Sequence, residues 1–134
     1  MKISSLYPVI CTDNVEESKL FYTSFFPFEI SFETDWYVSL AAKDSNYELA
    51  IVDYSHPSVP QNFQKQAQGM ILNFEVEDVA TEYNRLKQQN IPLIQDIKDE
   101  QWGQRHFIIS DPNGILIDVI EMIEPSIEYL NDYN

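Results

Sequence analysis

Aromatic side chains are the part of this sequence best suited to contact a ligand, since its 134 residues include 8 Tyr, 8 Phe and 2 Trp. Flat rings stack on aromatic and cationic groups, so several of them together can line a small-molecule site. Trp102 is the strongest candidate, because it stands beside Gly103 at the entrance to a predicted strand and is amphipathic. For every ring the alternative is packing in a core. The other ring candidates are Phe32, Trp36, Tyr37, Tyr47 and Phe107.

Cysteine, histidine and basic side chains are few. Cys11 is the single cysteine, so it cannot form an intramolecular disulfide, and its apolar strand favours a buried side chain over a reactive thiol. A chain without disulfides is expected in the cytoplasm. The two histidines, His56 and His106, are expected to have satisfied surface or hydrogen-bonding roles. Arg105 is either part of a structural ion pair or a ligand contact.

The charge is strongly acidic, with 22 Asp and Glu against 8 Lys and Arg and a net charge of −14. Binding to nucleic acid or to an anionic membrane needs clustered positive charge, so neither partner is expected. An acidic protein attracts cationic ligands over long range, although acidity that serves solubility alone is the simpler interpretation. We find no signal-peptide pattern at the N-terminus and no apolar run of transmembrane length.

The chain also contains an internal repeat. Asp13-Asn14-Val15 opens one predicted helix, and Glu77-Asp78-Val79 opens another at the same point of the second copy. Asn14 and Asp78 are the expected N-caps, and Glu17 completes a capping box with Asn14. An apolar strand precedes each helix and strands follow it. A unit this small cannot bury a full core alone, so the two copies are expected to pack together.

These elements predict an α+β fold of two βαβββ modules packed around a shared cleft, since the seam between two copies is a natural place for a pocket. The first module is expected over residues 1–57, a linker over 58–68, the second module over 69–123 and an acidic tail over 124–134. The turn Asp111-Pro112-Asn113-Gly114 is a strong hairpin signal. Strands are expected over 6–12, 28–32, 36–40, 47–54, 70–76, 102–110 and 115–123, with another starting near 92–94.

Three stretches, in the right order on a repeated unit, resemble one known family. They are Pro8-Val9-Ile10 with Asn14-Val15-Glu16-Glu17-Ser18 and Phe21-Tyr22, then Ile71 to Val79, then Trp102 to Phe107 with Ser110 to Gly114 and Ile117-Asp118-Val119. Over roughly residues 5–123 the chain is similar to the glyoxalase/bleomycin-resistance/extradiol-dioxygenase domains, the vicinal oxygen chelate superfamily. The resemblance implies the fold described above, a cleft site and a homodimer.

Enzymes of this family commonly hold a divalent metal on inward-facing strand residues. The resemblance puts Tyr7, Ile71 and Asp118 at the positions of the usual His, His and Glu ligands, with Glu48 at a looser fourth position. A tyrosine hydroxyl is a poor ligand at neutral pH and isoleucine has no donor atom, so neither metal nor cofactor is expected.

The resemblance therefore points to the metal-free, bleomycin-resistance-like branch, whose members sequester a bulky cationic antibiotic. We expect metal-independent binding of a cationic or aromatic small molecule. The candidate ligand-binding residues are Tyr7, Trp36, Tyr47, Glu48, Asn73, Trp102, Arg105, Phe107 and Asp118.

Two other functions stay open at this point. Tyr7, Glu48 and Asp118 could converge as acid and base in a lyase, isomerase or dioxygenase-type enzyme of the same superfamily. A pure interaction module is the third possibility. The sequence does not identify the ligand.

Overall fold

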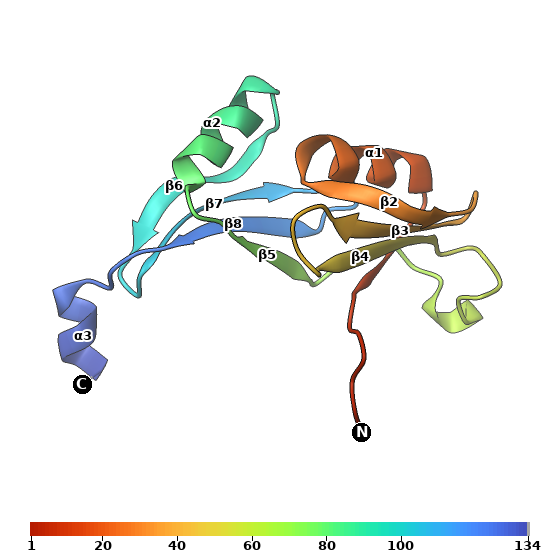
Figure 1. Ribbon diagram of the computed structural model, residues 1–134, viewed down its shortest axis with the longest axis horizontal. Coiled ribbons are helices and arrows are strands. Elements are labelled where there is room, and N and C mark those ends of the chain that lie inside the picture. The colour runs from red at the N-terminus through yellow and green to blue at the C-terminus, as the bar shows by residue number, and fades with distance from the viewer. Residues whose placement is uncertain (134) are drawn as a thin grey trace. The chain divides into compact units, whose positions relative to one another are not determined.

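The computed structural model describes residues 1–133. The chain divides into two compact units, the first comprising residues 1–68 and the second beginning at Gly69. Each unit holds one four-stranded sheet with a helix against one of its faces (Figure 1).

The first unit has strand order β1-β4-β3-β2, in which β1 and β4 are parallel and the other neighbours antiparallel. Its elements are β1 (Val9–Thr12), α1 (Val15–Phe25), β2 (Phe28–Glu33), β3 (Tyr37–Ala42), β4 (Glu48–Asp53) and the 3₁₀ turn η1 (Gln61–Phe63).

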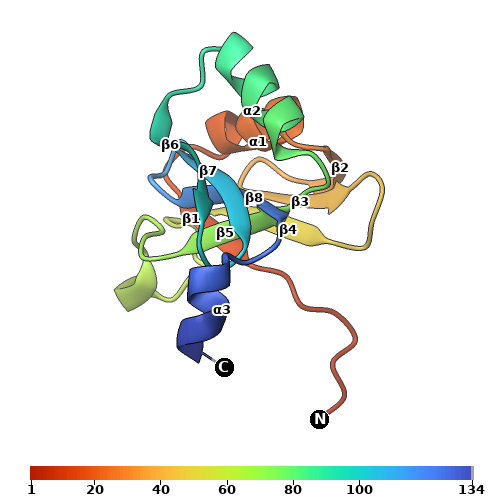
Figure 2. The ribbon, with the colours of Figure 1, turned by 90° about the vertical axis from the view of Figure 1, so that its left-hand side faces the viewer.

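The second unit repeats this topology with strand order β5-β8-β7-β6, and again only the first pair is parallel. Its elements are β5 (Ile71–Glu75), α2 (Val79–Gln88), β6 (Leu93–Glu100), β7 (Gln104–Ser110), β8 (Leu116–Met122) and α3 (Ile127–Tyr133). Figure 2 shows α3 following β8 at the C-terminal end of this unit. The predicted acidic tail thus contains a short helix.

Side-chain caps start both long helices, as the sequence predicts. The Asn14 Oδ1 accepts from the Glu17 N–H at 3.1 Å, as an N-cap does. The reciprocal bond of the predicted capping box is missing, because the Glu17 carboxylate accepts from the Asn14 side-chain Nδ2, while the Asn14 backbone N–H donates to the Thr12 Oγ1. Asp78 is the N-cap of α2, and its carboxylate accepts from the N–H and the hydroxyl of Thr81. The chain leaves α1 just before Pro27, which cannot continue a helix.

The helix-side face of each sheet forms its core. Strand residues fully buried on this face include Leu40 and Ile51 in the first unit and Phe107 and Ile109 in the second. Helix residues buried against them include Tyr22 of α1. Fully burying one such side chain contributes about 1.5–3 kcal/mol, so these contacts fix the register of both sheets.

The predicted hairpin turn and the predicted start of the first strand can be compared directly with the structure. The hairpin at residues 111–114 is confirmed: the Gly114 N–H donates to the Asp111 carbonyl at 3.1 Å, with Gly114 at φ 89°. The first strand is shorter than predicted, because β1 begins at Val9 and not at Leu6. Residues 1–9 are all exposed, and Pro8 offers the sheet no N–H donor.

The end of the predicted linker lies along the outer edge of β1. The Ala67 N–H donates to the Cys11 carbonyl at 3.0 Å, and the Gln66 side chain accepts from the Asp13 N–H at 3.1 Å. Residues 66–67 therefore belong to the first unit as an edge cover.

Among the described residues, no helix combines the length and the apolar character needed to cross a membrane.

Candidate functional site

The face of the second sheet turned away from α2 carries His106 and Asp118. Phe107 pairs with Val119, and the ring contact between Phe107 and Tyr83 of α2 shows that this pair faces the helix. Successive strand residues alternate between faces, so His106 and Asp118 lie on the opposite face. Asn73 of β5 is the register partner of Asp118 and shares this face.

His106 lies between two carboxylates on that face. Its Nδ1 is 2.7 Å from the Asp118 Oδ1 and its Nε2 is 2.9 Å from the Glu100 Oε2. The imidazole side chain is buried, whereas the two carboxylates keep partial exposure. Gln95 lies beside the same ring, with its Nε2 3.4 Å from the His106 Nε2. We call Glu100, His106 and Asp118 the histidine clamp.

The clamp favours a protonated imidazole. Burial alone lowers the pKa of His106, but the hydrogen bonds to Glu100 and then to Asp118 outweigh it and raise the pKa above its ordinary value. The same hydrogen bond from His106, helped by nearby Lys98, lowers the pKa of Glu100. Both carboxylates keep oxygen atoms that His106 does not occupy.

Trp102 lies at one end of this face. Its indole Nε1 donates to the Gln104 Oε1 at 2.8 Å. Gln104 is two residues before His106 on β7 and is the register partner of both Glu100 and Met122. Trp102 is 49 % exposed, so its ring remains available to a ligand. This face thus combines an aromatic ring, two carboxylates and an amide.

Phe107 and Arg105, two further candidates on β7, lie on the face of the second sheet that is turned toward α2. Phe107 is fully buried with its ring edge-on to Tyr83, as the core-packing alternative expects, and it offers no surface to a ligand. The Arg105 Nε donates to the Asp99 Oδ1 at 2.6 Å. Of the two roles expected for Arg105, the structure therefore shows the ion pair. The Asp99 carboxylate raises the pKa of Arg105 and has its own pKa lowered in return.

The first unit holds the remaining candidates. Tyr7 is 43 % exposed, just before β1, and Tyr47 is 77 % exposed, just before β4. Glu48, at the start of β4, accepts a hydrogen bond from the Ser5 hydroxyl at 2.9 Å. The clamp has no counterpart among these residues.

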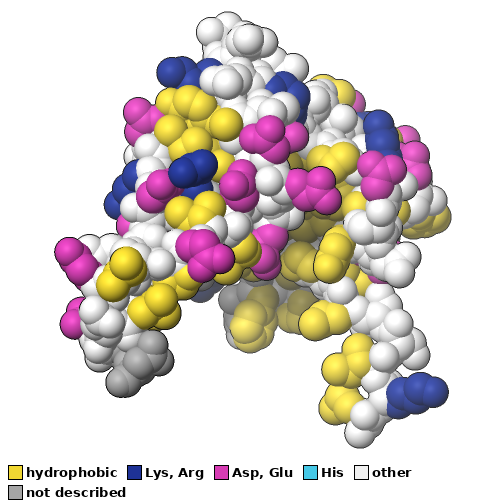
Figure 3. All heavy atoms as spheres, turned by 60° about the vertical axis from the view of Figure 1, so that its left-hand side comes forward, with side chains coloured by type: hydrophobic (Ala, Val, Ile, Leu, Met, Phe, Trp, Pro, Cys, Tyr) yellow, Lys and Arg dark blue, Asp and Glu magenta, His cyan; other side chains and the backbone are white. Residues whose placement is uncertain are grey.

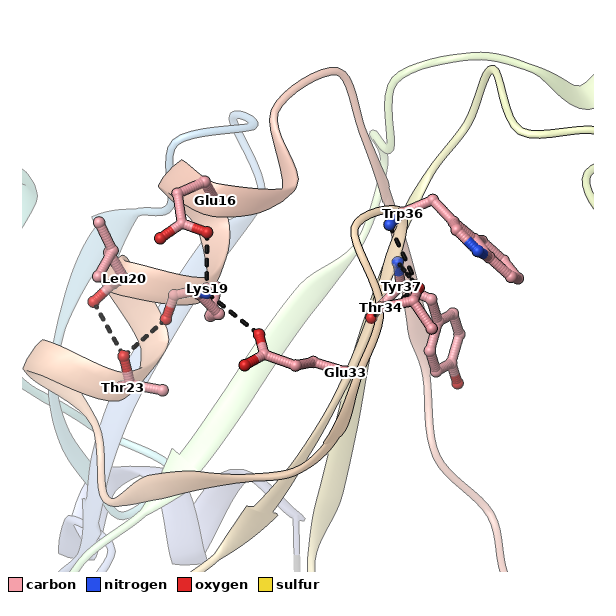
Figure 4. Close-up of polar contacts among 8 residues, drawn as sticks. All are labelled: Glu16, Lys19, Leu20, Thr23, Glu33, Thr34, Trp36 and Tyr37. Carbon is pink, nitrogen blue, oxygen red and sulfur yellow. Dashed lines mark hydrogen bonds and ion pairs between the residues drawn. The ribbon is translucent and has the colours of Figure 1, made fainter.

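Trp36 and Tyr37 are set by the turn between β2 and β3. The Thr34 Oγ1 accepts from the N–H groups of both residues, at 3.2 and 3.0 Å (Figure 4). The Trp36 ring is stacked on His56, with centroids 3.5 Å apart and an interplanar angle of 3°. One face of this indole is therefore already occupied by a protein ring.

The residues present do not fit the chelating site of the family. Ile71 has no donor atom, and one oxygen of Asp118 is committed to His106. Both nitrogens of His106 face carboxylates, which leaves neither lone pair for a metal. Across residues 1–133, no three His, Cys, Asp or Glu side chains are grouped so as to hold a metal ion.

Sequence reasoning missed the clamp, although one signal for it was present. The predicted hairpin at residues 111–114 pairs β7 with β8 in a register that sets Ile108 opposite Asp118. His106 is two residues from Ile108 on the same face, so a diagonal contact with Asp118 could have been derived. Glu100 could not, because the pairing of β6 with β7 contains irregularities that no turn motif indicates.

Acidic side chains are common on the surface of the molecule. Figure 3 shows Asp and Glu side chains spread among apolar ones over the visible surface, in keeping with the net charge of −14.

Several solved structures share this fold. A superfamily member from Sphaerobacter thermophilus has a TM-score of 0.73 at 19% identity, covering 89% of this chain and 98% of its own. TnmS3, an antibiotic binding protein from Streptomyces sp. CB03234, has a TM-score of 0.71 at 23% identity, covering 91% and 98%. Lactoylglutathione lyase from Agrobacterium tumefaciens has a TM-score of 0.71 at 20% identity, covering 90% and 95%. At these identities the likeness establishes the fold alone.

Comparison with curated proteins finds no match. A family model, however, matches residues 5–119, which is most of the chain. The two four-stranded sheets with three helices agree with the fold of the solved structures. The chain therefore belongs to the Glyoxalase/Bleomycin resistance protein/Dioxygenase superfamily.

Proposed function

We propose that this protein binds a cationic, aromatic small molecule without the help of a metal, on the face of the second sheet that carries the histidine clamp. The observation that carries the proposal is the pair of partly exposed carboxylates, Glu100 and Asp118, held on either side of His106 beside the half-exposed ring of Trp102. A flat cation could stack on the indole and meet the negative charge of the clamp.

The charge balance supports a cationic ligand. With His106 protonated, the clamp retains one net negative charge, and the whole chain carries −14, which attracts cations over long range. Lys98 lies 3.5 Å from Glu100 and offsets part of this field. The name of one structural neighbour, an antibiotic binding protein, agrees with a binding function of this kind.

A thermal-shift screen tests the proposal. Cationic antibiotics, aromatic acids and divalent metals are each added to the full chain, because a compound that binds the native state raises the unfolding midpoint. We expect shifts from aromatic cations. Shifts confined to aromatic acids or to metals would contradict the proposal.

Substitutions then locate the site. Trp102→Ala is expected to weaken binding of an aromatic cation roughly tenfold, and Asp118→Asn to weaken it by a similar factor. Trp36→Ala and Glu48→Gln are the matched controls, since they remove an indole and a carboxylate from the first unit. Equal losses from the controls would move the site away from the clamp.

An enzyme is the second candidate, favoured by the buried His106, whose Nδ1 lies 2.7 Å from the Asp118 Oδ1. In an isomerase of this superfamily, Asp118 would accept a proton from the carbon next to a substrate carbonyl, the electron pair of the C–H bond would form an enolate, and Asp118 would return the proton to the neighbouring carbon. His106 would keep the Asp118 carboxylate in position through its hydrogen bond. Tyr7 and Glu48 of the first unit are the other candidates for acid and base. Turnover of dicarbonyl or lactoylthiol substrates that Asp118→Asn abolishes would support this candidate, and no turnover with any added metal would set it aside.

We further propose that the protein is a cytoplasmic homodimer. Its single cysteine suits a reducing compartment. Size-exclusion chromatography with light scattering tests the dimer, and a strict monomer would contradict it.

A further inference from the structure

The turn that carries Trp102 is tied to the chain that follows β8. The Ile123 N–H donates to the Gly103 carbonyl at 2.9 Å, and the Ser126 N–H donates to the Gln101 carbonyl at 2.8 Å. Figures 1 and 2 both show the chain passing this turn on its way from β8 to α3. We call residues 123–126 the strap.

The strap and the turn approach each other so closely that only glycine fits between them. A Cβ on Gly103 would lie 2.8 Å from the Ile123 carbonyl oxygen and 3.1 Å from the Pro125 Cγ. Gly103 also has φ 104°, which a residue with a side chain rarely adopts. By contrast, Gly114 has φ 89° but nothing within 4 Å of the position of its Cβ.

The Trp102 ring is thus held from two sides. Its backbone belongs to the strapped turn, and its indole N–H is fixed by the Gln104 side chain. Because the ring is about half exposed, packing covers only part of it, and its direction also depends on the backbone beneath it. A shift of the turn would therefore change the position of the ring relative to the face of Glu100 and Asp118.

We propose that the strap is a positioning element of the ligand site, which holds the turn of Trp102 at the end of the clamp face and so connects the C-terminal segment to ligand binding. The proposal rests on the proposed function in so far as Trp102 contacts the ligand. A ring that is already ordered loses less freedom when a ligand binds. Loosening the strap is therefore expected to weaken binding while leaving the clamp in place.

Fluorescence of Trp102 tests the positioning directly. The chain has two tryptophans, so Trp36→Phe leaves Trp102 as the single reporter. In this background we compare Gly103→Ala with Gly114→Ala. Both place a side chain at positive φ, but only the first forces the strap away. Emission maximum, acrylamide quenching and the Kd for ethidium, a flat aromatic cation, are measured for each.

We expect Gly103→Ala to shift the emission, to increase quenching and to weaken ethidium binding roughly fivefold, with Gly114→Ala like the parent. A second pair keeps the test decisive if Gly103→Ala does not fold. Ser126→Ala removes only the hydroxyl that accepts from the Tyr129 N–H, whereas Ser126→Pro also removes the N–H that bonds to Gln101. Only Ser126→Pro is expected to reproduce the change in Trp102.

The two proposals fail in different ways. If Trp102→Ala leaves ethidium binding unchanged, the proposed function is wrong, whatever the fluorescence shows. If Trp102→Ala weakens binding but Gly103→Ala and Ser126→Pro match their controls in emission, quenching and Kd, the positioning role of the strap is wrong.

Discussion

The two sheets have the same strand order and similar residues on their helix sides, but their opposite faces differ in chemistry. The parallel pairs Val9–Ala50 and Asn73–Asp118 occupy corresponding places, which makes Tyr37 the counterpart of His106. The three corresponding positions on the face away from the helix hold Val9, Tyr37 and Ala50 in the first sheet and Asn73, His106 and Asp118 in the second.

This difference separates what the fold needs from what a site needs. The helix-side positions hold Val38, Leu40, Leu49 and Ile51 in one sheet and Phe107, Ile109, Ile117 and Val119 in the other, all buried. Both copies require an apolar layer there, because a sheet of this size is stable only when one face is covered. The other face is also partly covered, with Ala50, Val52 and Ile120 buried on it, but at its three corresponding positions only the second sheet carries ionisable acid and base groups.

The largest effects on stability are expected from substitutions on the helix-side faces, which are apolar in both sheets. Leu40→Ala and Ile109→Ala remove corresponding core side chains, both fully buried. Each is expected to lower the free energy of unfolding by about 2–5 kcal/mol, measured by urea denaturation. A cost below 1 kcal/mol at either position would break the equivalence of the two cores.

Substitutions on the faces away from the helices should have different effects on stability in the two sheets. His106→Leu leaves Glu100 and Asp118 without the cation between them and is expected to cost about 3 kcal/mol. Tyr37→Leu, at the matching position, is expected to cost about 1 kcal/mol, since it removes no charge. Urea denaturation of both variants checks this, and equal costs would show that the clamp adds nothing to the stability of the second unit.

The clamp also predicts how stability depends on pH. His106 has a raised pKa in the folded state, so its contribution is complete below its ordinary pKa of 6.5 and is lost as pH rises through the raised value. Glu100 has a lowered pKa, so its contribution is present above 4.5 and is lost as pH falls through the lowered value. The difference in unfolding free energy between the wild type and His106→Leu should be greatest between these limits. A difference that stays constant from pH 4 to pH 9 would contradict the protonated clamp.

Smaller effects are expected at the helix starts. Asn14→Ala removes the N-cap of α1 and is expected to cost about 1 kcal/mol, while Asn14→Asp, which keeps an accepting oxygen, should cost much less. Urea denaturation compares the two. A larger loss from Asp than from Ala would show that the Asn14 amide, and not its carbonyl oxygen, matters for the cap.

Much of the fold could be predicted from the sequence because its signals are local. The caps at Asn14 and Asp78, the break at Pro27 and the hairpin ending at Gly114 depend on residues within a few positions of one another. The clamp depends instead on which residues of three strands meet across a sheet. That information lies in the register, and an irregular pairing such as that of β6 with β7 hides it.

The predicted roles of single residues near β7 also depend on information that is not local in the sequence. Phe107 and Trp102 are both aromatic and close together in the sequence, yet one is wholly buried and the other half exposed. Composition cannot separate them. The strand predicted over 102–110 begins only at Gln104, so Trp102 lies in the turn before β7, whereas Phe107 lies within the strand on its helix side. Arg105 and His106 differ likewise, and each has its charged partner on its own face of the sheet.

The segment that covers the outer edge of β1 has a consequence for handling the protein. An uncovered edge strand is a template on which other chains can add strands, and in this unit Ala67 and Gln66 occupy the carbonyl of Cys11 and the N–H of Asp13. A protease cut between Ser55 and Phe63, or a proline at position 67, would free that template. Fibrous deposits in nicked or ageing preparations would then be seeded from the first unit, even while its apolar layer under α1 stayed intact.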